Sequence, residues 1–371
     1  MNLSLISEKL GIPEWRLRGA IKRHSVQVLG YRGREMLVFR KDVAGVERGT
    51  VVFGDEVVRG YPKIKRALLL SAALRSWKAE RVAVEEKLNG YNVRAALVDS
   101  RVVGVTRGGY VCPYTTSKLR EARECRRLLE ENPELMLCGE AVGTSNPYVV
   151  HEYPEAGEFG FFVFDVRHRD TNEPLSVPEK RRLLEEYGVQ GVPLLGVFRR
   201  EEAAERVLEI AQKLGAEGRE GVVLKDWEMV EEPLKYTPSQ TNLSDLRHAF
   251  AYPYDYGRDF LFSRIMREAY IAVERDMKGE ELSDAAAALG RSILLPMVES
   301  IRRVMEGEVL GESYELEFRS EEELLQMLEF LRRQGVSVQV EVLEEGGRRV
   351  RLKKLRHAST DRIRAVLRSG T

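Results

Sequence analysis

The sequence has few cysteines and no long apolar run. Its 371 residues include three cysteines, Cys112, Cys125 and Cys138, whose equal spacings of 13 are too open for the close pairs of a zinc site. No segment approaches the roughly 18 apolar residues of a membrane span. The first residues, MNLSLISEKLG, lack the basic start and apolar stretch of a signal peptide. We therefore expect free thiols, no membrane contact and a cytoplasmic location.

Net charge and a phosphate-binding loop are also absent. The chain has 59 Lys plus Arg and 59 Asp plus Glu, so its overall charge does not indicate a polyanionic partner. Basic residues still gather between Arg16 and Lys41, interleaved with aromatics, and between Arg348 and Arg368. These clusters fit either phosphate contacts or a solvated surface. No G-x-x-x-x-G-K-S/T occurs, which excludes P-loop chemistry. The charged fraction of 32% favours a thermophilic source.

Periodicity along the chain predicts an α+β protein made of four parts. Residues 1–55 read as a small module of two helices and a hairpin, and residues 56–243 as antiparallel sheet with a few helices, one of them spanning 117–132. Residues 244–312 are helical, and so apolar that they must pack on the central domain or on a second copy of the chain. Residues 313–371 read β-α-β-β-α, with a turn at Gly346-Gly347.

The stretch RVAVEEKLNGYNVRAALV, residues 81–98, places Lys87 beside an Asn-Gly pair. Apolar alternation on both sides of Asn89-Gly90 predicts a β-hairpin. Lysine is common at such edges because it discourages edge-to-edge association. Lys87 alone therefore does not separate a solvated edge residue from a functional one.

Five further stretches place a polar or aromatic residue within or after an apolar strand. They are TRGG with Arg107, CGEAVG with Glu140, FVFD with Phe164 and Asp165, EGVVLK with Glu220 and Lys225, and LKYT with Lys235. Cations meet phosphates, carboxylates hold a metal or ribose hydroxyls, and an aromatic face stacks on a base. Together they form the inventory of a nucleoside-triphosphate site in which a lysine can itself attack phosphorus.

This ordered set resembles the covalent nucleotidyltransferase superfamily of polynucleotide ligases and messenger-RNA capping enzymes. There, a lysine in K-x-D/N-G forms a lysyl-nucleotide, and KLNG at 87–90 matches with Lys87 as nucleophile. Asn92 stands where DNA ligases and capping enzymes usually carry arginine and several RNA ligases carry asparagine. Those enzymes also continue into a β-barrel, whereas this chain becomes helical after Asp245. The whole chain is thus similar to the archaeal ATP-dependent RNA ligases.

The resemblance implies an ATP-grasp-like nucleotidyltransferase domain, a helical dimerisation domain at 244–312 that makes a homodimer, and three chemical steps. Lys87 takes AMP from ATP, AMP passes to the 5′-phosphate of single-stranded RNA, and the RNA 3′-hydroxyl displaces it, including by circularisation. We expect packing among cations to free the Lys87 amine for attack. Glu140 and Glu220 are the implied ligands of Mg²⁺ or Mn²⁺. The implied nucleotide-binding residues are Asn92, Arg107, Glu140, Phe164, Glu220, Lys225 and Lys235.

Several readings stay open. Many relatives end their last motif in K-x-K, but in Pro233-Leu234-Lys235 only Lys235 matches. Phe164 fits a core aromatic as well as a stacking residue, and for Asp165 we expect a structural role that bonds nearby turns. A DNA ligase or a GTP-using capping enzyme would share the lysine chemistry but should carry the barrel. A non-catalytic RNA-binding protein would explain the basic ends, yet leave the ordered motifs without a use.

Overall fold

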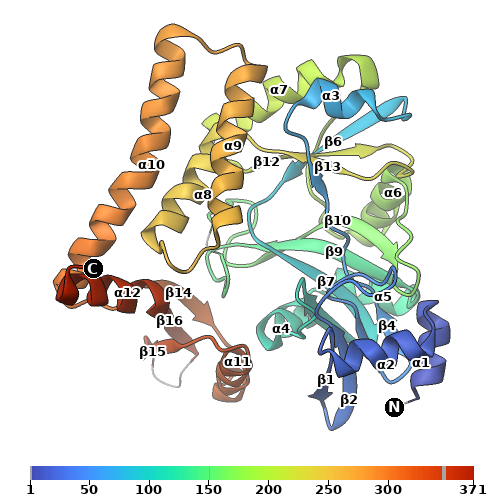
Figure 1. Cartoon of the computed structure of the whole chain (residues 1–371). Coiled ribbons are helices and arrows are strands. Elements are labelled where there is room, and N and C mark those ends of the chain that lie inside the picture. The colour runs from blue at the N-terminus through green and yellow to red at the C-terminus, as the bar shows by residue number, and fades with distance from the viewer. Residues whose placement is uncertain (1, 150, 345–347) are drawn as a thin grey trace.

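The computed structural model describes residues 2–149, 151–344 and 348–371. Its N-terminal part packs two helices on a four-stranded antiparallel sheet (Figure 1). These are α1 (Leu3–Leu10), α2 (Glu14–Lys22), β1 (Val26–Tyr31), β2 (Arg34–Phe39), β3 (Val51–Phe53) and β4 (Glu56–Val58). The predicted β1–β2 hairpin is confirmed, since Val26 pairs with Phe39 and Tyr31 with Arg34.

The two faces of this small sheet bury different neighbours. Side chains alternate along β2, so Leu37 and Phe39 pack on the helices while Met36 and Val38 face the central domain. All four side chains are at most 5% exposed. The N-terminal module is therefore docked through a buried apolar face and can form a fixed wall beside the central domain.

The central part contains two sheets whose strands run antiparallel except for the β13–β5 pair. One sheet has the order β10-β9-β7-β8 and the other β11-β6-β12-β13-β5. The strands are β5 (Lys65–Arg66), β6 (Arg81–Lys87), β7 (Tyr91–Val98), β8 (Arg101–Thr106), β9 (Leu135–Val142), β10 (Gly160–His168), β11 (Leu194–Arg199), β12 (Gly221–Asp226) and β13 (Leu234–Tyr236). The predicted α+β class is confirmed.

The hairpin predicted at Asn89-Gly90 is wrong. β6 pairs with β11 and β12, whereas β7 pairs with β8 and β9, so the chain leaves one sheet at Lys87 and enters the other at Tyr91. Both strands are buried along most of their length and need neighbours on both sides, which a two-stranded hairpin could not supply. Gly90 permits the crossing, because a Cβ there would lie 2.2 Å from the carbonyl oxygen of Ala141.

Helices cover the outer faces of both sheets. The helices α3 (Leu70–Arg75) and α7 (Arg200–Ala216) pack on the sheet that contains β6. The helices α4 (Pro113–Glu121), α5 (Arg123–Glu131) and α6 (Val177–Tyr187) cover the other sheet. The single helix predicted for 117–132 is wrong, because Ala122 has extended backbone. The break lets Leu119 of α4 and Leu128 of α5 enter the same core.

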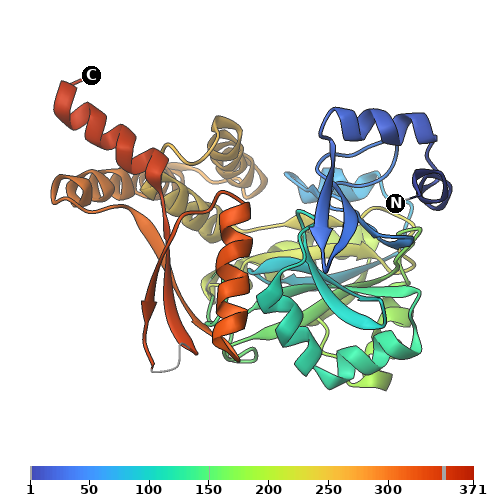
Figure 2. The same cartoon turned by 90° about the horizontal axis from the view of Figure 1, so that it is seen from below.

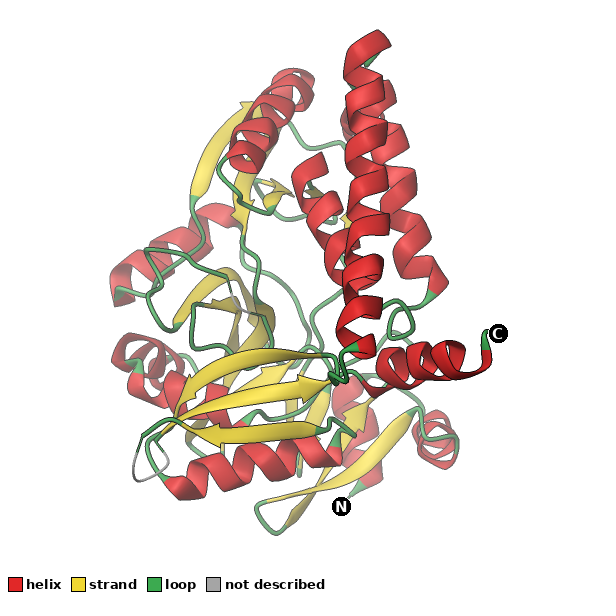
Figure 3. Cartoon of the chain, turned by 90° about the vertical axis from the view of Figure 1, so that its left-hand side faces the viewer, coloured by secondary structure: helices red, strands yellow, loops and turns green. Residues whose placement is uncertain are grey.

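The predicted helical region contains α8 (Ser239–Ala251), α9 (Arg258–Glu274) and α10 (Gly279–Met305). Figure 3 shows the long α10 beside the other two helices on the outside of the molecule. Glu274 of α9 accepts hydrogen bonds from the Tyr236 hydroxyl at 3.0 Å and from the backbone of Leu70. The region is thereby anchored to the central domain next to β13. No helix among the described residues is long and apolar enough to cross a membrane.

The last part has the predicted β-α-β-β-α order. It comprises β14 (Gly311–Glu317), α11 (Glu321–Arg333), β15 (Val338–Val342), β16 (Arg349–Leu355) and α12 (His357–Ser369). The predicted glycine turn between β15 and β16 lies outside the described residues. Tyr314 and Phe318 pack with Tyr114 of the central domain, which places α11 beside α4 and opposite the N-terminal module (Figure 2).

Candidate active site

The predicted residues meet where the two central sheets face one another. A cavity of about 400 Å³ is lined by seven of the eight, namely Lys87, Asn92, Arg107, Glu140, Phe164, Lys225 and Lys235. The lysines come from β6, β12 and β13 of one sheet, while Asn92, Glu140 and Phe164 come from β7, β9 and β10 of the other. The eighth residue, Glu220, contacts Lys87. Six stretches that are distant in sequence therefore meet at one cavity.

Lys87 is held at the end of β6 by a carboxylate and by a fixed turn. Its Nζ lies 2.5 Å from Oε1 of Glu220, because Lys87 pairs in register with Gly221, the next residue. In the following turn the backbone N–H of Asn89 donates to the Tyr153 hydroxyl at 2.8 Å, and the Asn89 amide lies 2.6 Å from Nε2 of His151. The sequence prediction surrounded Lys87 with cations; the structure adds an anionic partner within proton-transfer distance.

Glu140 and Asn92 lie opposite Lys87 and can hold a cation. The two residues pair in register across β9 and β7. Burial raises the pKa of Glu140 to about 7; the positive charge of Lys87 opposes the rise and the negative charge of Glu220 adds to it. The charge of Glu220 therefore affects the ionisation of Glu140. Oδ1 of Asn92 is buried without a hydrogen-bond partner among the described residues.

This donor set fits a divalent cation only when phosphate oxygens complete it. Two carboxylates and an orphaned amide oxygen are hard oxygen ligands of the kind that Mg²⁺ accepts. No cluster of three His, Cys, Asp or Glu side chains suited to a metal occurs within the described residues. A Mg²⁺ ion typically uses one or two protein carboxylates together with substrate phosphates, which is the arrangement available here.

A second cation lies beside Lys235, where the sequence offered none. Arg66 of β5 pairs in register with Lys235 of β13. Burial, together with the nearby positive charges of Arg66, Lys87 and Arg107, lowers the pKa of Lys235 to about 8. Nη1 of Arg66 donates to the Thr237 hydroxyl at 2.5 Å, while its buried Nε has no hydrogen-bond partner within the described chain. Among the described residues only Lys87 of these four cations has an ion pair, with Glu220, and the remaining positive charge favours a bound polyanion.

Phe164 reaches the cavity because β10 contains a bulge. The register with β9 shifts between Val163 and Asp165, so Phe164 is the extra residue. A bulge of this kind turns a side chain away from its regular direction. Its ring forms an edge contact with Tyr61, with centroids 5.0 Å apart, and it is half-buried. Phe164 thus combines the two readings offered by the sequence, since it packs on the core and lines the cavity.

Lys225 lies on the cavity floor, and its amine is fully engaged. It is 1% exposed, and its Nζ contacts Oδ1 of Asp165 at 2.6 Å, Oε2 of Glu85 at 2.7 Å and the carbonyl of Phe164 at 2.5 Å. Burial alone would lower the pKa of Lys225, but the two carboxylates raise it above its ordinary value. Lys225 therefore stays charged and fixes the Phe164 bulge from below.

Asp165 is structural, as predicted, but it does not bond nearby turns. Its partners are the Tyr61 hydroxyl at 2.7 Å, Arg167 at 3.3 Å and Lys225. Burial would raise the pKa of Asp165, but Lys225 and Arg167 hold it well below its usual range. These bonds join the segment that carries Tyr61 to both central sheets.

Arg94 is a positioning residue that the sequence did not reveal. It is fully buried on β7 and donates to the carbonyls of Gly49, Arg59 and Thr106. These bonds connect the N-terminal module to the turn that carries Arg107. An arginine within an apolar strand run was the available signal, but its carbonyl partners are distant in sequence. The same limitation hid Arg66 and Tyr61.

Comparisons with known proteins match the central and C-terminal parts of the chain to ligase families. The family model described as "RNA ligase" matches residues 80–237, and the one described as "Ligase Pab1020 C-terminal region" matches residues 248–370. The uncharacterised protein MJ0414 of Methanocaldococcus jannaschii is 40% identical over 93% of this chain and 89% of its own length.

Solved structures agree over the full length. Two forms of an archaeal ATP-dependent RNA ligase are each 43% identical, with a TM-score of 0.95 and complete coverage of both chains. A protein of Aquifex aeolicus, provisionally described as an ATP-dependent DNA ligase, is 30% identical, with a TM-score of 0.87 and coverage of 96% of this chain and 98% of its own. The fold, the cavity and the full-length similarity lead to one conclusion: the chain belongs to the archaeal ATP-dependent RNA ligases, enzymes that join RNA ends.

Proposed function

We propose that Lys87 is the nucleophile of this ligase and carries AMP as a lysyl-adenylate. The observation that supports it is the position of the Lys87 amine, which lies in the cavity beside a carboxylate and among cations. Before attack the ammonium group must lose a proton, and Glu220 is the carboxylate within reach of it. Nζ then forms a bond to the α-phosphorus of ATP, and the bond to pyrophosphate breaks.

The other cavity residues are proposed to bind and orient the nucleotide. Lys235, with Arg66 behind it, supplies positive charge to the phosphates and so takes over the role of the lysine missing from the last motif. Phe164 offers an aromatic wall for adenine, and Lys225 holds that wall in place. Glu140, Glu220 and the Asn92 oxygen would hold Mg²⁺ or Mn²⁺, which neutralises phosphate charge when bound.

Arg107 is proposed to meet the RNA. Its side chain is exposed at the mouth of the cavity, in the turn after β8, where a strand end can approach from solvent. A guanidinium group can form a bidentate contact with a phosphate, so Arg107 suits the RNA 5′-phosphate that accepts AMP. The RNA 3′-hydroxyl then attacks that phosphate and releases AMP, giving a joined or circular strand.

A homodimer through the helical region is also proposed. Leu294 and Leu295 of α10 are 58% and 57% exposed, and Phe262 of α9 is 63% exposed. Further large apolar side chains are exposed on the same two helices, among them Met266, Val273 and Met305. Such a surface is costly in water unless a partner covers it, and a second copy through a two-fold axis is the simplest partner.

The specificity for the nucleotide and the specificity for the polynucleotide are tested in separate reactions. The protein is incubated with α-labelled ATP or GTP and a divalent cation, and then with 5′-phosphorylated single-stranded RNA or DNA. We expect covalent label from ATP and joining or circularisation of RNA. Label from GTP would favour capping chemistry, and preferential joining of DNA would favour a DNA ligase, the alternative raised by the Aquifex aeolicus relative. No covalent label from either nucleotide would refute the proposal.

A further inference from the structure

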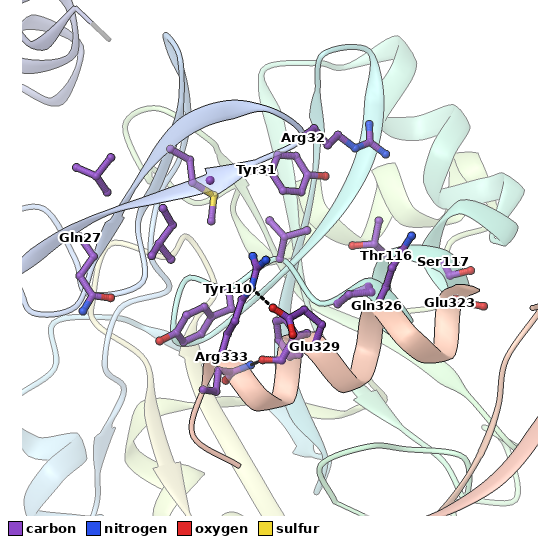
Figure 4. Close-up of a pocket in the computed structure, with 18 of the residues that line it drawn as sticks. Gln27, Tyr31, Arg32, Tyr110, Thr116, Ser117, Glu323, Gln326, Glu329 and Arg333 are labelled. Carbon is purple, nitrogen blue, oxygen red and sulfur yellow. Dashed lines mark hydrogen bonds and ion pairs between the residues drawn. The ribbon is translucent and has the colours of Figure 1, made fainter. Parts of the chain in front are cut away.

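A second and larger cavity lies between the N-terminal module and the C-terminal part. Its volume is about 1240 Å³, about three times the 400 Å³ of the active-site cavity. One wall is β1 with the turn that follows it, another is α11, and one side of α4 lines the groove between them (Figure 4). Three parts of the chain therefore build this inter-domain groove, and none of the proposed catalytic steps uses it.

Aromatic side chains line the inter-domain groove. Tyr31, Tyr110 and Phe330 each come from a different part of the chain, and all three are half-buried. The rings of Tyr110 and Phe330 lie edge to face with centroids 6.2 Å apart. Half-buried rings in a groove of this size give flat apolar surfaces on which unpaired bases can stack.

The groove also carries positive charge that is not neutralised locally. Arg32 lies 5.5 Å above the Tyr31 ring and has no ion pair within the described part of the chain. Arg120 donates to the Val102 carbonyl, but its buried Nη2 has no hydrogen-bond partner among the described residues. Burial lowers the pKa of Arg120, and the neighbouring charges of Arg32 and Arg101 lower it further. This arrangement fits an anion between Arg32 and Arg120.

The three acids that line the groove, Glu322, Glu323 and Glu329, all lie on α11, and Glu329 is paired on its own helix. Glu329 bonds Arg332 and Arg333 at 2.7 and 2.8 Å, as Figure 4 shows for Arg333. Glu323 accepts from the backbone N–H of Arg319 at 2.8 Å. The opposite wall is therefore left with a net positive charge.

One short turn joins the groove to the active site. Arg107 and Gly108 line the active-site cavity, whereas Tyr110 lines the groove. Arg40 stiffens this turn, since its Nη1 donates to the Gly108 carbonyl at 2.8 Å and its guanidinium lies 4.5 Å from the Tyr110 ring. The same turn therefore borders both cavities, and the groove is the cavity next to the one that holds Arg107.

We propose that the inter-domain groove binds single-stranded RNA, holding nucleotides a few positions from the reacting end. Bases stack on Tyr31, Tyr110 and Phe330, and a phosphate lies between Arg32 and Arg120. The proposal rests on the RNA ligase function and adds to it a length requirement, because only an RNA that extends beyond the active site can reach the groove. It also gives a function to the part of the basic and aromatic N-terminal stretch that contains Tyr31 and Arg32.

The test compares RNA affinity in variants with a matched surface control. Tyr31→Ala removes a stacking ring, Tyr31→Phe keeps it, and Arg32→Ala removes an exposed charge. Arg16→Ala is the control, because Arg16 is an exposed arginine of the same module outside the groove. Affinity is measured by fluorescence anisotropy on 5′-phosphorylated single-stranded RNA of about 20 and about 3 nucleotides, the longer able to stack on the rings.

We expect Tyr31→Ala to weaken binding of the long RNA roughly fivefold or more, with little change for the short one. Tyr31→Phe should bind as the wild type does. Arg32→Ala should reduce the slope of log affinity against log salt by about 0.7, the value for one phosphate contact on a single strand. Arg16→Ala should leave both quantities unchanged.

Two outcomes would overturn the proposal. One is unchanged affinity for the long RNA in both Tyr31→Ala and Arg32→Ala, which would leave the groove to another partner such as a protein. The other is an equal loss for long and short RNA, which would indicate a general effect on the fold. Labelling of the wild type by ATP is measured in parallel, so that a failure of the ligase function is distinguished from a failure of the groove.

Discussion

Replacing Asp165 by asparagine should destabilise the central domain strongly, although the change keeps the shape of the side chain. Asp165 is 2% exposed and contacts Lys225, 1% exposed, and Arg167, 6% exposed. The variant leaves both cations buried without this counter-ion. Breaking a buried ion pair costs about 3–5 kcal/mol. Lys225 keeps Glu85 at 2.7 Å, so we expect the lower end, about 3 kcal/mol.

A loss of that size should lower the Tm by roughly 6–12 °C for a domain of this size. Thermal unfolding can be followed by tryptophan fluorescence, because Trp77 and Trp227 both pack in cores of the central domain. Asp170→Asn is the matched control, since Asp170 is an exposed carboxylate at the end of the same segment. Equal Tm values for the two variants would refute the assignment of Asp165 to a buried charge network.

The pH dependence of this difference follows from the sign of the shift. The pKa of Asp165 is held below its ordinary value in the folded protein, so its stabilising effect is complete above the unfolded pKa, about 3.9. The stability gap between wild type and Asp165→Asn should therefore be constant from neutral pH down to about 5 and shrink below it. A gap that closes between pH 7 and 5 would contradict the depressed pKa.

Three further predictions concern the active site and the helical region. The pKa of Glu140 is about 7, so its carboxylate is protonated at lower pH and cannot hold a cation. We therefore expect kcat/KM for adenylylation to rise through about pH 7, and Glu140→Gln to be slower and to lack that rise. A pH profile that is unchanged in Glu140→Gln would argue against Glu140 as a ligand. Gly90→Ala should impair adenylylation at least tenfold and lower the Tm, since its Cβ would meet the backbone at 2.2 Å, while Gly30→Ala, with no atom within 4 Å, should do neither. Leu294→Glu should convert a dimer into monomers, as measured by light scattering. The control Arg291→Glu, a charge change on the same helix α10, should leave the dimer intact. A wild-type protein that is monomeric would contradict the dimer.

Short-range patterns in the sequence, together with the family resemblance, were sufficient to select residues that line one cavity but not to predict the crossing that positions Lys87. The ordered stretches around Glu140, Phe164 and Lys235 predicted residues that line one cavity. Alternation around Asn89-Gly90 indicated a hairpin because a strand pattern reports burial, not the identity of the neighbouring strand. The neighbours of β6 and β7 lie on strands far along the chain, and only tertiary packing selects them.

The charge environment of the site was also beyond prediction from the sequence. Glu220 was expected at a metal, yet its ion pair with Lys87 depends on the register between β12 and β6. Lys225 was expected to bind the nucleotide, yet its amine is held by Asp165 and Glu85, which come from different sheets. Such partners follow from three-dimensional proximity, so a motif predicts which residues gather but not which charges they meet.

The measurement that tests the account most directly is the identity of the residue that carries AMP. The protein is incubated with ATP and a divalent cation, digested, and analysed by mass spectrometry, alongside Lys87→Ala and the control Lys78→Ala, an exposed lysine before the same strand. We predict a single AMP adduct on Lys87 in the wild type and in Lys78→Ala, and none in Lys87→Ala. An adduct on Lys225 or Lys235, or one that persists in Lys87→Ala, would contradict the account.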